Sequence, residues 1–395
     1  MTTPVKLHVP LLDLKPQYKA LKAEIDAAIL KVCDSQAFIL GASTRELEAD
    51  MAAYCGAKHA VALSSGTDAL LIALMALDIG AGDEVITSPY TFFATGGTIA
   101  RTGARPVWID IDPVSFNIDV KLLADFLDTQ CERVDGVLVN KATGGRVRAI
   151  MPVHLYGQAA DMPPILALAR KHGLRVVEDA AQAIGSAIPG GQRVGTLGDI
   201  GCFSFFPTKN LGAFGDAGAV TTNDDALAAN LRMLRVHGME PKYYHALVGG
   251  NFRIDEIQAA VLVIKLKHLE DWHAARQRNA AYYNSAFAAA GLAGTVTTPV
   301  ALPGYRHIYN QYIIRVPRRD ELRAYLGECG VGAEVYYPVP LHMQECFNYL
   351  GYKPEDCPES ARAARETLAL PIFPDLTETQ LQHVVDSIAR FYGVK

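Results

Sequence analysis

Apolar and polar residues follow two recurring patterns between residues 16 and 222. Over 16–30 the apolar side chains recur every three or four positions, which predicts an amphipathic helix. The same spacing returns at 69–77 and 165–172, between short apolar runs of strand length. The predicted strands span residues 60–63, 84–87, 106–109, 137–139, 149–153, 175–179, 200–206 and 219–222. This alternation predicts an α/β fold, a three-layer α/β/α domain in which helices cover both faces of a mostly parallel sheet.

Two local motifs mark helix starts within this pattern. The run STRE at 43–46 has the spacing of a capping box, which predicts that a second helix begins there. The run SSGTD at 64–68 follows the first predicted strand and opens the helix at 69–77, as a strand, glycine turn and helix unit. The stretch KATGGRVR at 141–148 predicts a turn between two strands.

The pattern changes after Asp255. Residues 257–268 are expected to continue into one long charged helix that runs through Trp272 and Tyr283. Beyond it, strand-like and helical stretches predict a smaller α+β domain, with strands at 309–316 and 332–337 and helices at 321–329 and 377–392. We therefore expect a large domain with its N-terminal segment over 1–255, and a linking helix with a small C-terminal domain over 256–395.

Composition excludes several classes of protein. The 395 residues carry 37 Lys and Arg against 42 Asp and Glu, a net charge of −5, which argues against nucleic-acid binding. The seven cysteines form no CxxC pair and no zinc-site spacing with histidine, so we expect neither a disulfide framework nor a metal site. No apolar run approaches the ~18 residues of a membrane span. These features predict a cytoplasmic protein that binds no membrane.

Three positions in the large domain carry candidate chemistry. Ser65-Gly66-Thr67 lies at a predicted helix start, where backbone N–H groups can hold a phosphate. Asp179 ends an apolar strand, and Lys209 lies among apolar and small residues 30 positions later. Each has an ordinary explanation when taken singly, as helix caps for the first two and a surface lysine for the third. Together they supply a phosphate site, an anion for a pyridinium and an amine for a Schiff base, which are the requirements of pyridoxal phosphate.

The chain also resembles a known family, the DegT/DnrJ/EryC1/StrS sugar aminotransferases, which have the aspartate-aminotransferase fold (fold type I). The resemblance covers nearly the whole chain, from the segment at 38–41 to the terminal helix. The matching stretches occur in family order and read SSGTDAL, SPYTFFAT, PVHLYG, VEDAAQAIG, FSFFPTKNLG, GGNFRIDEIQAA, YNQYIIR and YYPVPLH.

The resemblance implies roles for residues around pyridoxal phosphate. Lys209 is implied to form the Schiff base, Asp179 to pair with the pyridine nitrogen and Gln182 to lie near the ring. Phe92 is at the position where the family places an aromatic ring against the cofactor. The phosphate is implied to be held by Gly66, Thr67 and Ser204.

The family also implies an assembly and a reaction. Asn251 resembles a residue that reaches the phosphate from the neighbouring subunit, so the expected active unit is a homodimer with shared sites. The reaction moves an amino group, usually from L-glutamate, through pyridoxamine phosphate to a nucleotide-linked keto-sugar, for deoxyamino sugars of cell-surface polysaccharides. Some members replace the lysine by histidine and dehydrate instead. This chain keeps Lys209, which favours transamination.

Substrate contacts follow less directly from the sequence. The stretch YYPVPLH, with Tyr337 and His342, resembles that of members acting on 3-keto sugars linked to dTDP or UDP. Arg253 is a candidate for a carboxylate, or else part of an ion pair at a subunit boundary. Tyr309 and Ile39 are further pocket candidates. His154 is left outside the catalytic set.

Three other interpretations stay open. The substrate could be a 4-keto nucleotide sugar or a keto-inositol. The chain could also be a regulatory protein that binds pyridoxal phosphate on the same scaffold without catalysis. The intact set of Asp179, Lys209 and Ser204 favours an enzyme.

Overall fold

The computed structural model describes residues 7–394, which form one large sheet and one small one. The large sheet has nine strands in the described range, and its main path runs β1-β9-β8-β7-β6-β2-β3, with β5 joining β4 to β6. Neighbours from β8 to β3 are parallel, whereas β9 is antiparallel to both of its neighbours. The mostly parallel sheet is therefore confirmed. Its strands are β1 (His59–Leu63), β2 (Asp83–Thr87), β3 (Arg105–Trp108), β4 (Cys131–Val134), β5 (Val137–Asn140), β6 (Arg146–Ile150), β7 (Arg175–Asp179), β8 (Ile200–Ser204) and β9 (Gly218–Thr222).

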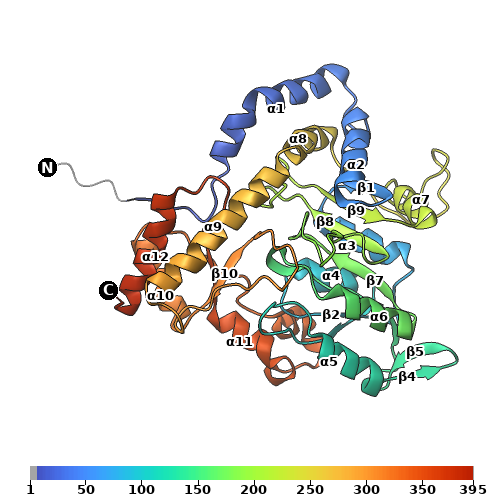
Figure 1. Ribbon diagram of the computed structural model, residues 1–395. Coiled ribbons are helices and arrows are strands. Elements are labelled where there is room, and N and C mark those ends of the chain that lie inside the picture. Colours follow the sequence, from blue (N-terminus) through green and yellow to red (C-terminus); the bar gives the residue numbers. More distant parts are fainter. Residues whose placement is uncertain (1–6, 395) are drawn as a thin grey trace.

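Helices cover both faces of this sheet (Figure 1). Successive residues of a strand point to opposite faces, so Val177 packs with Leu70 of α3 while Val176 packs with Ile165 of α6. This alternation confirms the predicted three layers. The α-helices are α1 (Lys15–Ser35), α2 (Ala42–Cys55), α3 (Gly66–Ala76), α4 (Phe93–Arg101), α5 (Val120–Asp125), α6 (Met162–His172), α7 (Asp225–Leu234), α8 (Glu256–Leu266), α9 (Leu269–Ala289), α10 (Arg319–Glu328), α11 (Pro358–Glu366) and α12 (Glu378–Tyr392).

Two strands of the large sheet differ from the sequence prediction. The strand expected at 149–153 lies at 146–150, because the chain leaves its turn early and Arg146 pairs with Asp83 of β2. No sequence pattern predicted β4, whose residues Cys131–Val134 are mostly exposed and pair only with β5 as a hairpin. A strand with one neighbour and a polar surface lacks the apolar run by which buried strands are recognised.

The prediction of a single long helix after residue 256 is wrong. The chain forms α8 and α9, separated by Lys267 and His268. The N–H groups of these two residues bond to carbonyls three positions back, on Ile264 and Lys265, instead of four. This tight turn ends α8, which is buried along nearly its whole length, and α9 begins at Leu269.

The small sheet consists of β10 (Tyr312–Arg315) and β11 (Thr367–Leu370), which are antiparallel. Its core includes side chains of α9, α10 and α12. The strand expected at 332–337 is absent, because Gly332 bonds to Val9 while Glu334 bonds to Ala369. Two bonds to different partners make no ladder. The division of the chain at residue 255 remains a prediction, and no helix within residues 7–394 could cross a membrane.

The start of α2 is capped by a carboxylate from a distant part of the chain, so the local capping box expected at 43–46 is wrong. Glu256 accepts hydrogen bonds from the backbone N–H groups of Gly41 (2.8 Å), Ser43 and Thr44 (3.2 Å), and from the Thr44 hydroxyl (2.6 Å). Burial alone would raise the pKa of Glu256, but these hydrogen bonds outweigh burial and lower its pKa below the ordinary 4.5. The Glu256 carboxylate thus ties α8 to α2 across the interior.

Replacing Glu256 should therefore destabilise the protein. In Glu256→Gln the free energy of unfolding at pH 7 should fall by ~2 kcal/mol, because charge-assisted bonds to buried N–H groups are lost. The folded pKa lies below the unfolded one, so this stabilisation is present above the unfolded pKa of 4.5 and is lost as the pH falls through the folded pKa. Denaturant unfolding at pH 7 and in acid measures both effects.

The matched control is Glu46→Gln, which changes the exposed residue of the predicted capping box. It should leave the free energy of unfolding within about 0.5 kcal/mol of the parent value. A large loss in Glu46→Gln with none in Glu256→Gln would restore the local capping box and contradict the capping described above.

Candidate active site

The carboxyl ends of β7 and β8 bring three of the predicted residues together. β7 ends at Asp179 and β8 at Ser204, and the two strands are parallel neighbours, with Asp179 opposite Cys202. Lys209 lies in the turn that follows β8. The carboxyl edge of a parallel sheet is the usual place for a ligand in α/β proteins. The candidate site is therefore built at this edge.

Asp179 is a buried carboxylate, with 5% of its surface exposed. Its Oδ2 accepts a hydrogen bond from the Thr95 hydroxyl at 2.7 Å, and Oδ1 accepts one from the N–H of Ala181 at 3.2 Å. Burial raises the pKa of Asp179, while the Thr95 bond, the Ala181 bond and the charge of Lys209 oppose that effect. An anion here is stabilised by a positive group.

Lys209 supplies an amine with a low pKa. Removal from water lowers the pKa of Lys209 from 10.5 to about 8, although the charge of Asp179 acts in the opposite direction. Lys265 also has a pKa lowered to about 8 by burial, and its Nζ donates a hydrogen bond to the carbonyl of Gly212. Of these two lysines, only Lys209 has a carboxylate among the causes of its pKa shift. Position beside Asp179, not pKa alone, distinguishes Lys209 as the candidate.

A glycine allows the first turn of α3 to approach the end of β8. A Cβ on Gly66 would lie 2.5 Å from the Cβ of Ser204, so a larger residue would push the helix away. The hydroxyls of Ser64 and Ser65 both donate to the carboxylate of Asp68, at 2.6 and 2.9 Å. They are therefore occupied, whereas Gly66, Thr67 and Ser204 lie together at a helix N-terminus, as a phosphate site requires.

Gln182 links two tyrosines beside this edge. Its Oε1 accepts a hydrogen bond from the N–H of Tyr156 at 2.8 Å, and its Nε2 donates to the hydroxyl of Tyr337 at 2.9 Å. The ring of Phe92, which is 56% exposed, lies 6.1 Å from the ring of Tyr337. The hydroxyl of Tyr90 accepts a hydrogen bond from the N–H of Tyr337. The structure thus brings Gln182, Phe92 and Tyr337 together.

Three predicted residues lie on two neighbouring segments near the end of β1. Arg253 forms a bridge with Leu63, the last residue of β1, and Asn251 is exposed beside it. Ile39, which is 51% exposed, forms a bridge with Asp255. The Nε of Arg253 is buried without a hydrogen-bond partner in the described part of the chain. These residues border the α3 side of the site.

Two predicted pocket residues are packed in the interior of this chain. The ring of Tyr309 stacks on His307 with 4.0 Å between the ring centres, and Tyr309 belongs to the core of the small sheet. His342 is 2% exposed, and neither ring nitrogen has a partner among residues 7–394. Burial lowers the pKa of His342, so its ring is neutral. The structure does not bring these two side chains into contact with Asp179 or Lys209.

Sequence reasoning missed Thr95, and it placed His154 outside the catalytic set. His154 is fully buried, and its Nδ1 accepts the N–H of Ala160 at 3.0 Å, so its Nε2 donates to Glu178 at 2.9 Å. Glu178 also accepts three backbone N–H groups from the turn at 195–198. His154 therefore fixes the residue before Asp179. For Thr95 the sequence signal was its place three residues after Phe92, on the helix that faces the strand ends.

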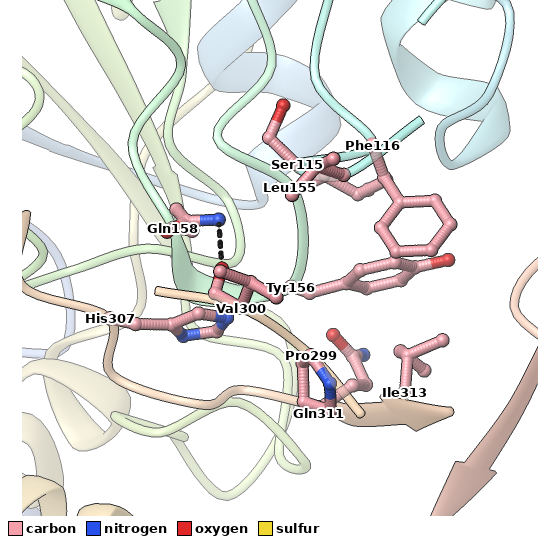
Figure 2. A pocket seen from close by; sticks show the side chains of 11 residues that line it. Ser115, Phe116, Leu155, Tyr156, Gln158, Pro299, Val300, His307, Gln311 and Ile313 are labelled. Carbon is pink, nitrogen blue, oxygen red and sulfur yellow. Dashed lines mark hydrogen bonds between the residues drawn. The ribbon is translucent and has the colours of Figure 1, made fainter. Parts of the chain in front are cut away.

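The small cavity in Figure 2 lies behind Tyr156 and is separate from the candidate site. It has a volume of about 10 Å³, enough for about one water molecule, and Gln158 donates to the carbonyl of Val300 beside it. Neither Lys209 nor Asp179 lines it. We interpret it as a packing gap.

The described residues fit pyridoxal phosphate. Gly66 gives the close approach that a phosphate site at α3 needs, and Lys209 supplies an amine that is partly neutral near pH 8. Asp179 offers a buried anion whose hydrogen-bond donors, Thr95 and Ala181, are both uncharged. Within residues 7–394, no group of three or more His, Cys, Asp or Glu side chains is placed to bind a metal ion.

Comparison with known proteins gives consistent results. The model of the DegT/DnrJ/EryC1/StrS aminotransferase family matches residues 19–389. The chain is 50% identical to the "Pleiotropic regulatory protein" of Geobacillus stearothermophilus, over 98% of this chain and 99% of that protein. It is 42% identical to the UDP-N-acetyl-3-dehydro-alpha-D-glucosamine 3-aminotransferase of Acidithiobacillus ferrooxidans, over 97% of each. The crystal structure of DesV from S. venezuelae matches with a TM-score of 0.89 and 41% identity, over 97% of this chain and 98% of that one.

The lowered pKa of Lys209 can be tested in the cofactor-free protein. The neutral amine reacts with acylating reagents, so labelling of Lys209 should rise with pH around a midpoint near 8. Mass spectrometry of the peptide that contains Lys209, after short pulses of reagent, measures this midpoint. In Asp179→Asn the midpoint should move lower, because the opposing charge is removed. A midpoint above 10 in the parent protein would contradict desolvation of Lys209.

Proposed function

Because the chain belongs to the DegT/DnrJ/EryC1/StrS aminotransferase family, we propose that it transfers an amino group from L-glutamate to C-3 of a UDP- or dTDP-linked 3-keto hexose. The chain is a sugar aminotransferase of fold type I that depends on pyridoxal phosphate. The observation that carries the proposal is the desolvated Lys209 amine beside the buried Asp179. The name of the 42% identical relative, which specifies a 3-dehydro UDP sugar, supports C-3.

The chain's own residues divide the work of amino transfer. Pyridoxal phosphate, when bound, supplies an electron sink for the carbanion beside the transferred amino group. Lys209 would hold the cofactor through Nζ, and its free amine would accept and return the proton at the donor's Cα. The anionic carboxylate of Asp179 keeps the cofactor's ring nitrogen protonated, which favours that electron flow. The low dielectric around both groups strengthens their interaction with charge that develops nearby.

Binding of the cofactor and the donor is assigned to neighbouring groups. The N–H groups of Gly66 and Thr67 at the start of α3, with the hydroxyl of Ser204, bind the phosphate. Gln182 and Phe92 flank the ring. Arg253 has a buried Nε without a partner in residues 7–394, and we assign it to a carboxylate of glutamate or of the sugar.

Sugar contacts are proposed around the segment at 336–342 and across a subunit boundary. Tyr337 is held by Gln182 at the site, and Ile39 is exposed on the neighbouring segment. Contact of Tyr309 and His342 with the substrate stays a prediction, because both side chains are packed inside this chain. The interior placement of His342 favours a structural role over contact with sugar.

We also propose a homodimer in which Asn251 of one subunit reaches the phosphate in the other. Asn251 is exposed, and large apolar side chains near the site, Phe92, Phe206 and Phe214, are between 44% and 56% exposed. A second copy of the chain would cover such a surface. All seven cysteines are free, which fits a reducing compartment and supports a cytoplasmic location.

The Lys209→Ala variant tests the role of the amine. It should lose the visible absorbance of the bound cofactor, and turnover should fall by at least roughly a thousandfold. The matched control is Lys265→Met, which removes the other lysine with a pKa lowered to about 8 and should keep the absorbance. Normal turnover in Lys209→Ala would refute the assignment.

A regulatory function is the second candidate, because the 50% identical relative is named a regulatory protein. This chain retains Asp179, Lys209 and Ser204 at one strand edge, the set that catalysis requires and that a protein without catalysis could lose. The two interpretations differ in whether glutamate changes the absorbance of the bound cofactor. We expect the change, because glutamate is the proposed donor.

The position of the keto group in the sugar substrate can be tested with a panel of acceptors. After glutamate has converted the cofactor, we expect a 3-keto nucleotide sugar to restore the original absorbance at least roughly tenfold faster than its 4-keto isomer or a keto-inositol. The reason is that a misplaced carbonyl does not meet the reactive amine, and misplacement by ~1 Å can cost a hundredfold. Rapid-mixing absorbance at matched concentrations measures the rates. Preference for the 4-keto isomer or the inositol would refute C-3.

A further inference from the structure

Two buried threonines at the start of α4 form a hydrogen-bonded chain to Asp179. The Thr95 hydroxyl lies 2.7 Å from Oδ2 of Asp179, and the hydroxyls of Thr91 and Thr95 lie 3.0 Å apart. Exposed fractions of the two threonines are 3% and 0%, so water does not compete for these bonds. Three side chains, from the segment just before α4, from α4 and from β7, therefore share one network that water does not reach.

The direction of this chain follows from proton counting. An ionised carboxylate only accepts, so the single hydroxyl proton of Thr95 is donated to Asp179. The oxygen of Thr95 can then only accept from its other neighbour, so the proton of Thr91 is donated to Thr95. The result is a directed series, from Thr91 to Thr95 to Asp179, in which each bond polarises the next.

Thr95 departs from the usual behaviour of threonine within a helix. A helical threonine commonly bonds back to a carbonyl of the preceding turn, as Thr98 does with the carbonyl of Ala94 at 2.8 Å. Thr95 is in the first turn of the same helix, and its hydroxyl bonds across to β7 instead. Thr95 and Thr98 lie on the same helix and are buried to nearly the same extent. The contrast points to a specific use of Thr95.

We propose that Thr95, oriented by Thr91, is a positioning residue that fixes the rotation of the Asp179 carboxylate and stabilises its anionic form for the cofactor's ring nitrogen. This inference rests on the role of Asp179 in the proposed function. Thr95 contacts neither substrate nor the transferred group, so it acts through Asp179 alone.

The surroundings of Asp179 make this hydrogen bond important. Burial raises the pKa of Asp179, and the strongest opposing influence is the bond from Thr95, followed by the N–H of Ala181. Lys209 and His154 add smaller electrostatic effects in the same direction. Tyr337 and Cys202 also face Asp179, and their pKa values are raised by burial and, to a smaller extent, by the charge of Asp179. Within residues 7–394, Thr95 is the only side chain that donates a hydrogen bond to Asp179, so no other side chain would compensate for its loss.

The test uses the holoenzyme and three variants of α4. Thr95→Val keeps the shape and removes the hydroxyl, Thr95→Ser restores a hydroxyl, and Thr98→Val makes the same change one turn away. The readouts are the dissociation constant for pyridoxal phosphate and the pH midpoint of the visible absorbance band, with circular dichroism as a check on folding. A purely structural role would not move the pH midpoint.

In Thr95→Val, we expect the dissociation constant to rise roughly tenfold and the pH midpoint to move by about one unit, because a bond to a charged group is lost. The midpoint should move in the same direction as in Asp179→Asn. Thr95→Ser should recover most of both changes, and Thr98→Val should show neither. If Thr95→Val does not fold, Thr91→Val should show a smaller shift of the same sign.

The outcomes separate this inference from the proposed function. A pH midpoint in Thr95→Val equal to that in Thr98→Val, with a shifted midpoint in Asp179→Asn, would overturn the role of Thr95 alone. An unshifted midpoint in Asp179→Asn would overturn the role of Asp179, and with it this inference. Failure of Thr95→Ser to recover would also overturn the hydroxyl's role.

Discussion

The buried negative charge of Asp179 is the constraint on which the site depends. A carboxylate removed from water loses much of its solvation, so the protein must supply donors and a cation in compensation. The donors come from Thr95 on α4 and from the chain just after β7. The nearby cation is Lys209, which is half-buried, and its amine loses protons more easily because it is partly removed from water. Removal from water at the carboxyl ends of β7 and β8 therefore produces both an anion for a ring nitrogen and an amine that can hold or move a proton.

The rest of the fold keeps these groups close together. Parallel strands β7 and β8 place Asp179 and Ser204 side by side, and the turn after β8 carries Lys209. A Cβ on Gly212 would lie 2.3 Å from the carbonyl of Pro207, so this turn closes tightly only with glycine there. Lys265 of α8 donates to the same Gly212, and Glu256 at the start of α8 caps α2. Figure 1 shows α8 beside α2, away from the small sheet. The buried helix α8 thus stabilises the site indirectly.

How much of this arrangement the sequence could predict depends on the range of each interaction. The α/β class, the strand that ends at Asp179 and the glycine turn at Gly66 follow from local spacing, and the family resemblance is confirmed by the match over residues 19–389. The cap of α2 could not be predicted, because Glu256 lies more than 200 residues from Thr44 and outcompetes the local motif. The break between α8 and α9 depends on packing of α8, and the direction of the Thr95 hydroxyl depends on tertiary contact. Roles of the individual site residues remain predictions.

Lys209, and not another amine, is predicted to carry the cofactor. Two lysines have a pKa lowered to about 8, so reactivity alone does not decide between Lys209 and Lys265. Reduction of the purified holoenzyme with borohydride, followed by peptide mass spectrometry, fixes the cofactor to the lysine that holds it. We predict a single modified peptide with the added mass on Lys209. Modification of Lys265 or of any other lysine, with Lys209 unmodified, would contradict the account.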